Sequence, residues 1–342
     1  MDIVERAILT SETQTLVAAV VAGDLAGTLQ GAGPFTVFAP VNSAFAALDS
    51  YTLDALLASE NLEILQRVLG LHVIPGEAVL EAGLTDGGTA VTVEGSELTF
   101  DLSDAADPKV NGVSITATDI VVTNGVIHLV DEVILPAFNI VETATITEGF
   151  STLVAAVGAA DLGSALSDES ADLTVFAPTN AAFEALGGTV DLLLANPDIL
   201  SDVLLYHVLG AAVASSALSD GLTQATLETG EVTFTADGTS PSGFQINNAD
   251  ITVVDIQTSN GVIHVIDAVL TEGLDVVQRA TVTPETQTLT AAVVAASQRV
   301  GGSRHAAFGH RRCPVHGVRT GAGGFRGPRH GSAGHRARSG QR

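Results

Sequence analysis

Residues 33–48 read GPFTVFAPVNSAFAAL, and residues 172–186 read DLTVFAPTNAAFEAL. A second pair lies downstream, where residues 123–131 read TNGVIHLVD and residues 259–267 read SNGVIHVID. The first pair is offset by 138 residues and the second by 136. Solenoid repeats have periods of about 20–50 residues, so this longer period indicates a whole domain that is duplicated in tandem.

The first stretch predicts a strand followed by a short helix in each copy. The TVFAP run alternates and is stopped by Pro40 or Pro178, which is typical of the end of a strand. Asn42 and Asn180 come next, and we expect them to be the N-caps of the short helices SAFAAL and AAFEAL.

The remaining segments of each copy place helices before strands. Apolar residues at helical spacing occupy residues 13–29, 53–71, 151–166 and 191–205. Pro197 is placed to begin a second helix in the last of these segments. The later part of each copy alternates apolar residues with Thr or Glu, and turns are expected at Gly95, at Gly230 and at Asn111-Gly112. Helices followed by a sheet indicate an α+β fold class.

The last third of each copy predicts a hairpin. Asn124-Gly125 and Asn260-Gly261 each separate a Thr/Val/Ile-rich run from the sequence VIH. An Asn-Gly pair between two such runs favours a tight hairpin, because both residues tolerate positive φ.

Together these blocks resemble the fasciclin-like domain family. The blocks are TVFAPxNxAF at residues 36–45 and 174–183, the middle pair Tyr206-His207, and NGxIHxID at residues 124–131 and 260–267. Copy one departs at the middle pair, where Leu71-His72 replaces Tyr-His. The resemblance covers residues 1–272. It implies a β-wedge with helices packed on it, in two tandem copies plus an incomplete third, and a surface or extracellular adhesion role without a reaction or a cofactor.

Four histidines, His72, His128, His207 and His264, occupy the same two positions in each copy. A metal or acid–base site is one interpretation, because imidazole titrates near neutrality and ligates metals. The alternative, which the apolar surroundings favour, is a structural histidine whose ring nitrogens bond backbone groups between helix and sheet. No metal-ligand or catalytic motif accompanies them, and no metal site is expected.

An Asp-Ile pair precedes the last block of each copy, at Asp119-Ile120 and Asp255-Ile256. In animal members of the resembled family, an Asp-Ile pair near this place is linked to integrin binding. The resemblance therefore makes these four residues the candidate binding residues. The alternative is a solvated strand Asp beside a core Ile.

The chain is acidic, with a net charge of −25 over 342 residues. All 39 acidic residues lie in residues 1–298 with only four basic ones, whereas residues 299–342 hold ten Arg and no acid. Such an excess repels nucleic acid and anionic membranes, so neither is an expected partner. Because salt screens self-repulsion, the composition favours a salt-adapted microbe over an acidic extracellular protein from an ordinary habitat.

A third copy begins at residues 276–296, which match residues 3–23. Beyond it, a reading frame shifted by one base permits PFTVFAPVxxAFxxL, so we predict a frameshift near residues 297–299. Cys313 and the histidines near it are then no zinc site. The expected domains are residues 1–136 and 137–272, a truncated third at 273–298 whose opening helix lacks the strands that would bury it, and a disordered tail at 299–342.

These observations predict a non-enzymatic adhesion or matrix-binding protein with a surface protein or polysaccharide as partner. A ligand-free spacer of the cell envelope and, more remotely, a metal-dependent hydrolase are the alternatives. Met1 aligns with Phe138 and Leu274 at the starts of the later copies. We therefore expect a leader or an earlier repeat ahead of it and a secreted or cell-surface location, and we expect no membrane insertion of this chain.

Overall fold

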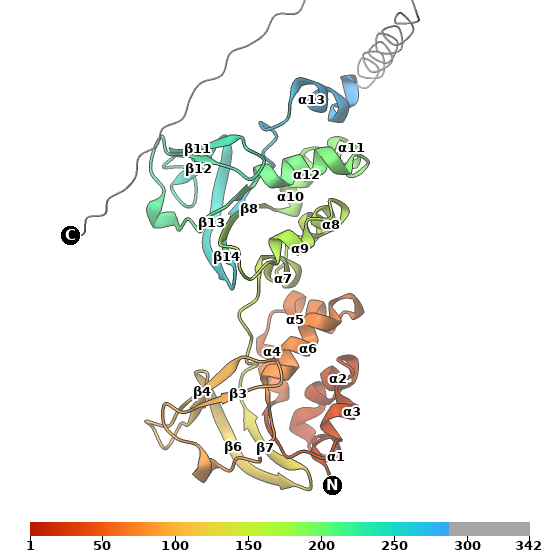
Figure 1. The fold of residues 1–342 in the computed structure, drawn as a ribbon, viewed down its shortest axis with the longest axis vertical. Coiled ribbons are helices and arrows are strands. Elements are labelled where there is room, and N and C mark those ends of the chain that lie inside the picture. Colours follow the sequence, from red (N-terminus) through yellow and green to blue (C-terminus); the bar gives the residue numbers. More distant parts are fainter. Residues whose placement is uncertain (287–342) are drawn as a thin grey trace, which may run out of the picture. The chain divides into compact units, whose positions relative to one another are not determined.

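The computed structural model describes residues 1–286. Copy one combines helices with a seven-stranded sheet (Figure 1). The helices of copy one are α1 (Ile3–Leu9), α2 (Gln14–Ala22), α3 (Ala26–Leu29), α4 (Asn42–Ala47), α5 (Ser50–Leu57) and α6 (Leu62–Leu71). Its strands are β1 (Phe35–Pro40), β2 (Val73–Pro75), β3 (Thr89–Val91), β4 (Glu97–Asp101), β5 (Lys109–Val110), β6 (Val113–Val122) and β7 (Gly125–Val130).

Copy two repeats this order, and the α+β fold class predicted from the sequence is confirmed. Its helices are α7 (Ile140–Ile146), α8 (Ser151–Ala159), α9 (Gly163–Leu166), α10 (Asn180–Ala185), α11 (Thr189–Leu194) and α12 (Pro197–Tyr206). Its strands are β8 (Leu173–Pro178), β9 (Val208–Leu209), β10 (Thr223–Ala225), β11 (Glu231–Ala236), β12 (Phe244–Ile246), β13 (Ala249–Thr258) and β14 (Gly261–Ile266). The opening helix of the third copy is α13 (Val276–Val282).

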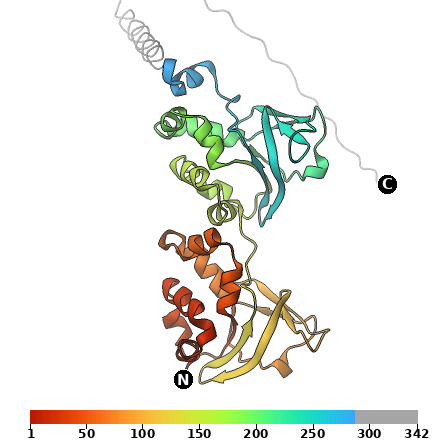
Figure 2. The same ribbon diagram turned by 180° about the vertical axis from the view of Figure 1, so that it is seen from behind.

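The two motif stretches of each copy form neighbouring strands. In copy one the sheet order is β2-β1-β7-β6-β5-β4-β3, and copy two has the equivalent order β9-β8-β14-β13-β12-β11-β10. β1 pairs in parallel with β7 and β8 pairs in parallel with β14, whereas the other pairings are antiparallel. The helices of each copy lie on one side of its sheet, which is also visible from behind (Figure 2).

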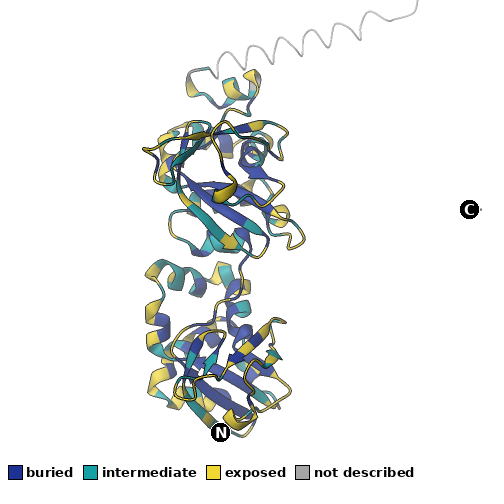
Figure 3. Cartoon of the chain, turned by 90° about the vertical axis from the view of Figure 1, so that its left-hand side faces the viewer, coloured by how far each residue is buried: buried dark blue, intermediate teal, exposed yellow. Residues whose placement is uncertain are grey.

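β1 is buried on both of its faces, which corrects the alternation read from TVFAP. The central strands of each copy are dark blue, the colour of buried residues, in Figure 3. Val37 and Ala39 belong to a core cluster between the helices and the sheet. Phe38 points to the other face and lies in a second cluster, where its ring centroid is 5.9 Å from that of Phe100 on β4. A wedge with a core on each face of its central strand therefore buries nearly every side chain of that strand, and the one polar side chain, Thr36, has its hydroxyl bonded to the Glu77 carbonyl and the Val79 N–H.

The prediction that Asn42 and Asn180 are N-caps is wrong. Each is the first residue of its helix, and the cap position belongs to the residue before it. The side-chain oxygen of Asn42 accepts a hydrogen bond from the Thr15 backbone N–H at 2.9 Å, and Asn180 accepts one from Thr152 N–H at the same distance. The two asparagines therefore join α4 to the start of α2 and α10 to the start of α8.

Two further expectations are corrected by the backbone. Residues 13–29 were expected as one helical segment, but α2 and α3 are separated at Asp24, which has a φ of 54°. The edge turn of copy one uses Gly95 with a φ of 103°, whereas in copy two the positive φ of 80° belongs to Thr229 and not to Gly230. The Asn111-Gly112 turn, with φ values of 47° and 82°, matches its prediction.

The start of the third copy is covered on one face only, by copy two. On the other face Val276, which stands at the position of the buried Ile3 and Ile140, is 86% exposed, and this is the face for which the strands of the third copy would be needed. Leu274 and Val282 are 7% and 3% exposed and belong to a core cluster of copy two. Residues 287–298 of the predicted opening helix, and the whole predicted frameshifted tail, lie outside the described residues.

Among residues 1–286, no helix has both the length and the apolar character that are needed to cross a membrane.

Candidate functional site

The histidines that follow α6 and α12 have both ring nitrogens bonded to backbone groups. His72 Nδ1 lies 2.7 Å from the Val68 carbonyl oxygen, and its Nε2 accepts a hydrogen bond from Ile134 N–H at 3.0 Å. His207 makes the same two contacts in copy two. The carbonyl needs a donor and the N–H an acceptor, so each ring is neutral with its proton on Nδ1. Burial lowers the pKa of both histidines to about 4, which keeps the rings uncharged.

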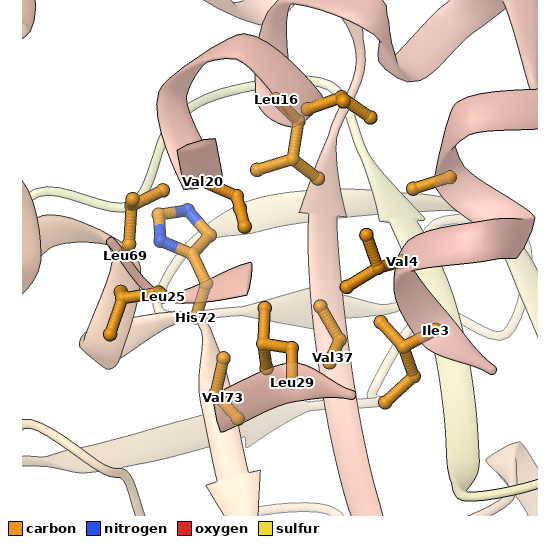
Figure 4. Close-up of a pocket in the computed structure, with 12 residues that line it drawn as sticks. Ile3, Val4, Leu16, Val20, Leu25, Leu29, Val37, Leu69, His72 and Val73 are labelled. Atoms are coloured by element: carbon orange, nitrogen blue, oxygen red, sulfur yellow. The ribbon is translucent and has the colours of Figure 1, made fainter. Parts of the chain in front are cut away.

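An apolar pocket ends at His72 in copy one, with aliphatic side chains on its other sides (Figure 4). Leu16, Val20 and Leu29 are among them, and copy two has the equivalent pocket beside His207. Each holds a cavity of about 30 Å³, which is room for about one water molecule. Small-molecule sites enclose roughly 300–1,000 Å³, so this pocket is a gap between helices and sheet and holds no substrate.

The strand histidines are also bonded to the backbone on both nitrogens. His128 Nε2 lies 2.9 Å from the Val79 carbonyl oxygen, and its Nδ1 faces Asp119 N–H at 3.4 Å. His264 has the same arrangement, with Asp255 N–H at 3.2 Å. Burial lowers the pKa of both histidines, so they too are neutral near pH 7. Within the described residues, no group of three or more acidic, His or Cys side chains is placed to hold a metal.

The Asp-Ile pairs lie on a bulge in the long strand of each copy. Asp119 and Asp255 both have a φ of 60°, at a point where the register of the hairpin shifts. The Asp119 carboxylate is exposed and accepts a hydrogen bond from Glu81 N–H at 2.8 Å. Ile120 and Ile256 point the other way and pack against the helix-side core clusters. The bulge therefore turns one carboxylate outward in each copy.

The second bulge is held more firmly than the first. Asp255 accepts hydrogen bonds from the Ser215 N–H at 2.7 Å and from the Ser215 hydroxyl. These bonds lower the pKa of Asp255. Because the N–H of each bulge Asp bonds the strand histidine nine residues later, bulge and histidine form one unit. This link was not predicted from the sequence, although the shared nine-residue spacing in both copies is a signal for it.

The Asn-Gly pairs form the expected hairpins, but for a different reason. The turn residues are Thr123-Asn124 in copy one, and Gly125 already pairs within the sheet. Asn124 is buried, accepts a hydrogen bond from Ile3 N–H at 3.0 Å, and donates to two carbonyls at the end of α3. A Cβ on Gly125 would lie 2.1 Å from the Phe35 carbonyl oxygen. The pair thus joins the opening helix to the sheet and brings two strands close together.

Copy two contains the same joint. Asn260 accepts from Ile140 N–H at 3.0 Å and donates to the Leu166 and Asp168 carbonyls, and a Cβ on Gly261 would meet a carbonyl oxygen at 2.0 Å. Pro40 and Pro178 occupy the last positions of the strands that run beside these hairpins.

With this geometry established, comparison with known proteins defines the family. The family model described as Fasciclin domain matches residues 11–136 and 148–272, and the chain belongs to this family. The family predicted from the sequence is thereby confirmed.

Relatives in bacteria and animals share parts of the chain. "Protein sll1483" of Synechocystis sp. is 45% identical over 136 residues, which are 40% of this chain and 74% of that protein. Transforming growth factor-beta-induced protein ig-h3 of Sus scrofa is 35% identical over 246 residues, which are 71% of this chain and 35% of that protein. Human periostin is 32% identical over 254 residues, or 73% of this chain and 30% of periostin. The chain therefore spans about a third of each of these animal proteins.

A solved FAS1 domain pair from the insect cell adhesion molecule fasciclin I also matches, with a TM-score of 0.37 and 16% identity. The match covers 79% of this chain and 96% of that one.

Proposed function

We propose that this protein is a non-enzymatic adhesion or matrix-binding protein that acts outside the cell or on its surface through tandem fasciclin domains. Its partner is a surface or matrix protein or a polysaccharide. Membership of the fasciclin family supports an adhesion-type role.

One observation carries the proposal, namely the repetition of the same bulge in both copies. Asp119 and Asp255 share their φ, their place in the long strand and their bond to a strand histidine. Asp119 and Ile120, together with Asp255 and Ile256, are the proposed binding residues. Two linked weak sites gain avidity because the second binding event becomes intramolecular.

The chemistry of the histidines argues for binding over catalysis. In His72, His128, His207 and His264 both ring nitrogens face backbone groups. A general base must reach the proton that it removes, and a metal ligand needs a free nitrogen. These rings therefore stabilise the fold and leave the surface bulges as the repeated polar feature.

The test measures binding of the full chain to immobilised envelope or matrix material as a function of concentration. Asp119→Asn and Asp255→Asn remove the negative charge, while Asn still accepts a hydrogen bond and tolerates the positive φ. We expect each single variant to lower the apparent affinity and the double variant to lower it further, as loss of avidity requires.

Asp131→Asn is the matched control, since it makes the same change of charge at an exposed position near the end of the same hairpin. Binding that is unchanged in the double variant would remove the bulges from the proposal. Absence of saturable binding by the unmodified chain would favour the ligand-free spacer instead.

A further inference from the structure

The opening helix of copy two uses its outer face to dock on copy one. Phe138 and Ile146 are 8% and 7% exposed and belong to the core cluster of copy one. α7 contacts α5, where the Thr52 hydroxyl donates a hydrogen bond to the Ile146 carbonyl at 2.9 Å. The face of α7 that points away from its own copy is therefore covered by the copy before it.

The opening helix of the third copy repeats this docking on copy two. Leu274 and Val282 stand at the positions of Phe138 and Ile146, and they belong to a core cluster that includes Leu193 of α11. α13 contacts α11 as α7 contacts α5. The same surface is thus used twice in one chain, each time with a preceding fasciclin domain as its partner.

The opening helix of copy one has the same surface, and it is uncovered. Met1 and Leu9, at the positions of Phe138 and Ile146, are 50% and 68% exposed, and Ile8 beside them is also exposed. The inner face of α1 is filled, since Ile3 is buried in copy one. The outer face therefore presents an apolar surface whose two counterparts are both interfaces.

A polar residue of the opening helix accompanies the apolar contact. Glu142 forms an ion pair with Arg67 of copy one. At the second junction Gln278 donates to the Asp202 carboxylate at 2.6 Å, and Asp202 stands where Arg67 stands in copy one. At the first junction an acidic residue of the opening helix faces a basic one, and at the second junction the neutral Gln278 faces an acidic one. A second acid facing Asp202 would be repelled.

α1 carries an acid at this position, Glu5, whose side chain is 58% exposed. We propose that the outer face of α1, formed by Met1, Glu5, Ile8 and Leu9, is a docking surface for a further fasciclin domain. This domain carries a base at the position of Arg67 and is joined head to tail, as copy one is joined to copy two. The inference goes beyond the adhesion role and does not depend on it.

The test places an extra copy of residues 1–137 ahead of Met1 in the full chain, which reproduces the spacing between copy one and Phe138. Leu9→Cys is introduced in the original α1 only, with Cys313→Ser to remove the other thiol. Ile146→Cys in the unextended chain is the matched control, because its side chain lies in an existing interface. The measurement is the rate at which iodoacetamide modifies the thiol.

We expect the thiol at position 9 to react rapidly in the unextended chain and at least about tenfold more slowly in the extended one, close to the rate at position 146. Arg67→Asp in the added copy should restore rapid modification. If the thiol at position 9 already reacts slowly in the unextended chain, and this chain sediments as a dimer, the surface binds a second molecule of the same protein and the proposal is overturned. Rapid modification in the extended chain would overturn it as well.

A second arm uses only the existing junction and so does not require the added copy to fold. In the unextended chain, Arg67→Asp should speed modification of the Ile146→Cys thiol, and adding Glu142→Gln should slow it again, because the pair then resembles Asp202 with Gln278. If Arg67→Asp leaves the rate unchanged, the charge rule that selects the partner is wrong.

Discussion

Copy one and copy two fill the same buried position with different side chains, Leu71 and Tyr206. The Tyr206 hydroxyl donates to the Glu231 carbonyl at 2.8 Å and accepts from the side chain of Asn247 at 3.2 Å. Leu71 makes only apolar contacts, in the cluster around Phe38. The tyrosine of the middle motif is therefore bonded to β11 and to the turn between β12 and β13, and copy one forms the same sheet without it.

The surroundings of the two residues differ in a matching way. Cβ atoms on Gly230 and Gly273 would each lie 2.6 Å from the Tyr206 ring. Copy one has Ser96 and Ala137 at these two positions, where the shorter Leu leaves room for a side chain. The buried position is therefore packed in two ways within one chain: a tyrosine ring lies against two glycines in copy two, and a leucine lies beside two residues with side chains in copy one.

The largest effect is expected at a residue that the two copies share. Asn124→Ala removes the side-chain partner of two buried backbone groups, the Ile3 N–H and the Leu29 carbonyl, and of the half-buried Gly31 carbonyl. We expect the free energy of unfolding to fall by about 3–5 kcal/mol, because unpaired buried polar groups keep their full desolvation penalty. Asn260→Ala should cost a similar amount in copy two. Urea denaturation followed by circular dichroism measures both.

Asn248→Ala serves as the control, since Asn248 is exposed in a turn and its loss should matter little. A cost for Asn124→Ala that is no greater than this control would show that the helix-to-sheet joint is dispensable.

The next effect is a loss of stability in mild acid that both copies share. Burial holds the pKa of His72 and His207 at about 4 in the folded chain, below the value of 6.5 in the unfolded chain. Between these two pKa values the unfolded chain binds more protons than the folded chain. The free energy of unfolding therefore carries the full contribution of the neutral histidines above pH 6.5 and falls as the pH is lowered towards 4. Each histidine should contribute about 3 kcal/mol to this loss.

The measurement is the free energy of unfolding from urea denaturation at several pH values between 7 and 4. His72→Gln removes one titrating ring, so its decline should be shallower than that of the unmodified chain, whatever its stability at pH 7. His128 and His264 shift in the same direction and add to the decline in both proteins. An identical slope in the variant would contradict a neutral, buried His72.

The third prediction tests the difference between the copies directly. Gly273→Ala places a methyl group against the Tyr206 ring, and overpacking of this kind should cost about 2 kcal/mol. In a Tyr206→Leu background the same change should cost far less, since copy one combines Leu71 with Ala137. The double-mutant cycle measured by urea denaturation gives the coupling. Equal costs in both backgrounds would mean that Gly273 is required for its backbone and not for the ring.

Patterns that are local in sequence predicted much of the fold. The TVFAP strand, the hairpin before VIH and the start of α12 at Pro197 match the structure, because each depends on neighbouring residues. The role of Asn124 did not follow from its neighbours, since its partners lie 93–121 residues away and a turn was the simpler interpretation.

The sequence predicted less of the candidate site than of the fold. The bulge at Asp119 arises where the long strand and its partner in the hairpin lose register, and no residue type announces such a shift. The bond from Asp119 N–H to His128 likewise needs the hairpin to be folded first. The partners of His72 and His207 on the segments after β7 and β14 lie 62 and 63 residues away.

The smallest effect sharpens the comparison at the edge turn, and it should be a gain. Thr229 adopts a φ of 80° where copy one has Gly95 at 103°. Positive φ is strained for a β-branched residue and costs glycine nothing, although glycine also loses more entropy on folding. We therefore expect Thr229→Gly to stabilise copy two by about 1 kcal/mol, and the reverse change Gly95→Thr to destabilise copy one. Urea midpoints measured with equal m-values decide the matter. A loss of stability in Thr229→Gly would mean that the threonine side chain stabilises the turn by more than the positive φ costs. The difference between Thr229 and Gly95 would then depend on side-chain contacts and not on the backbone alone.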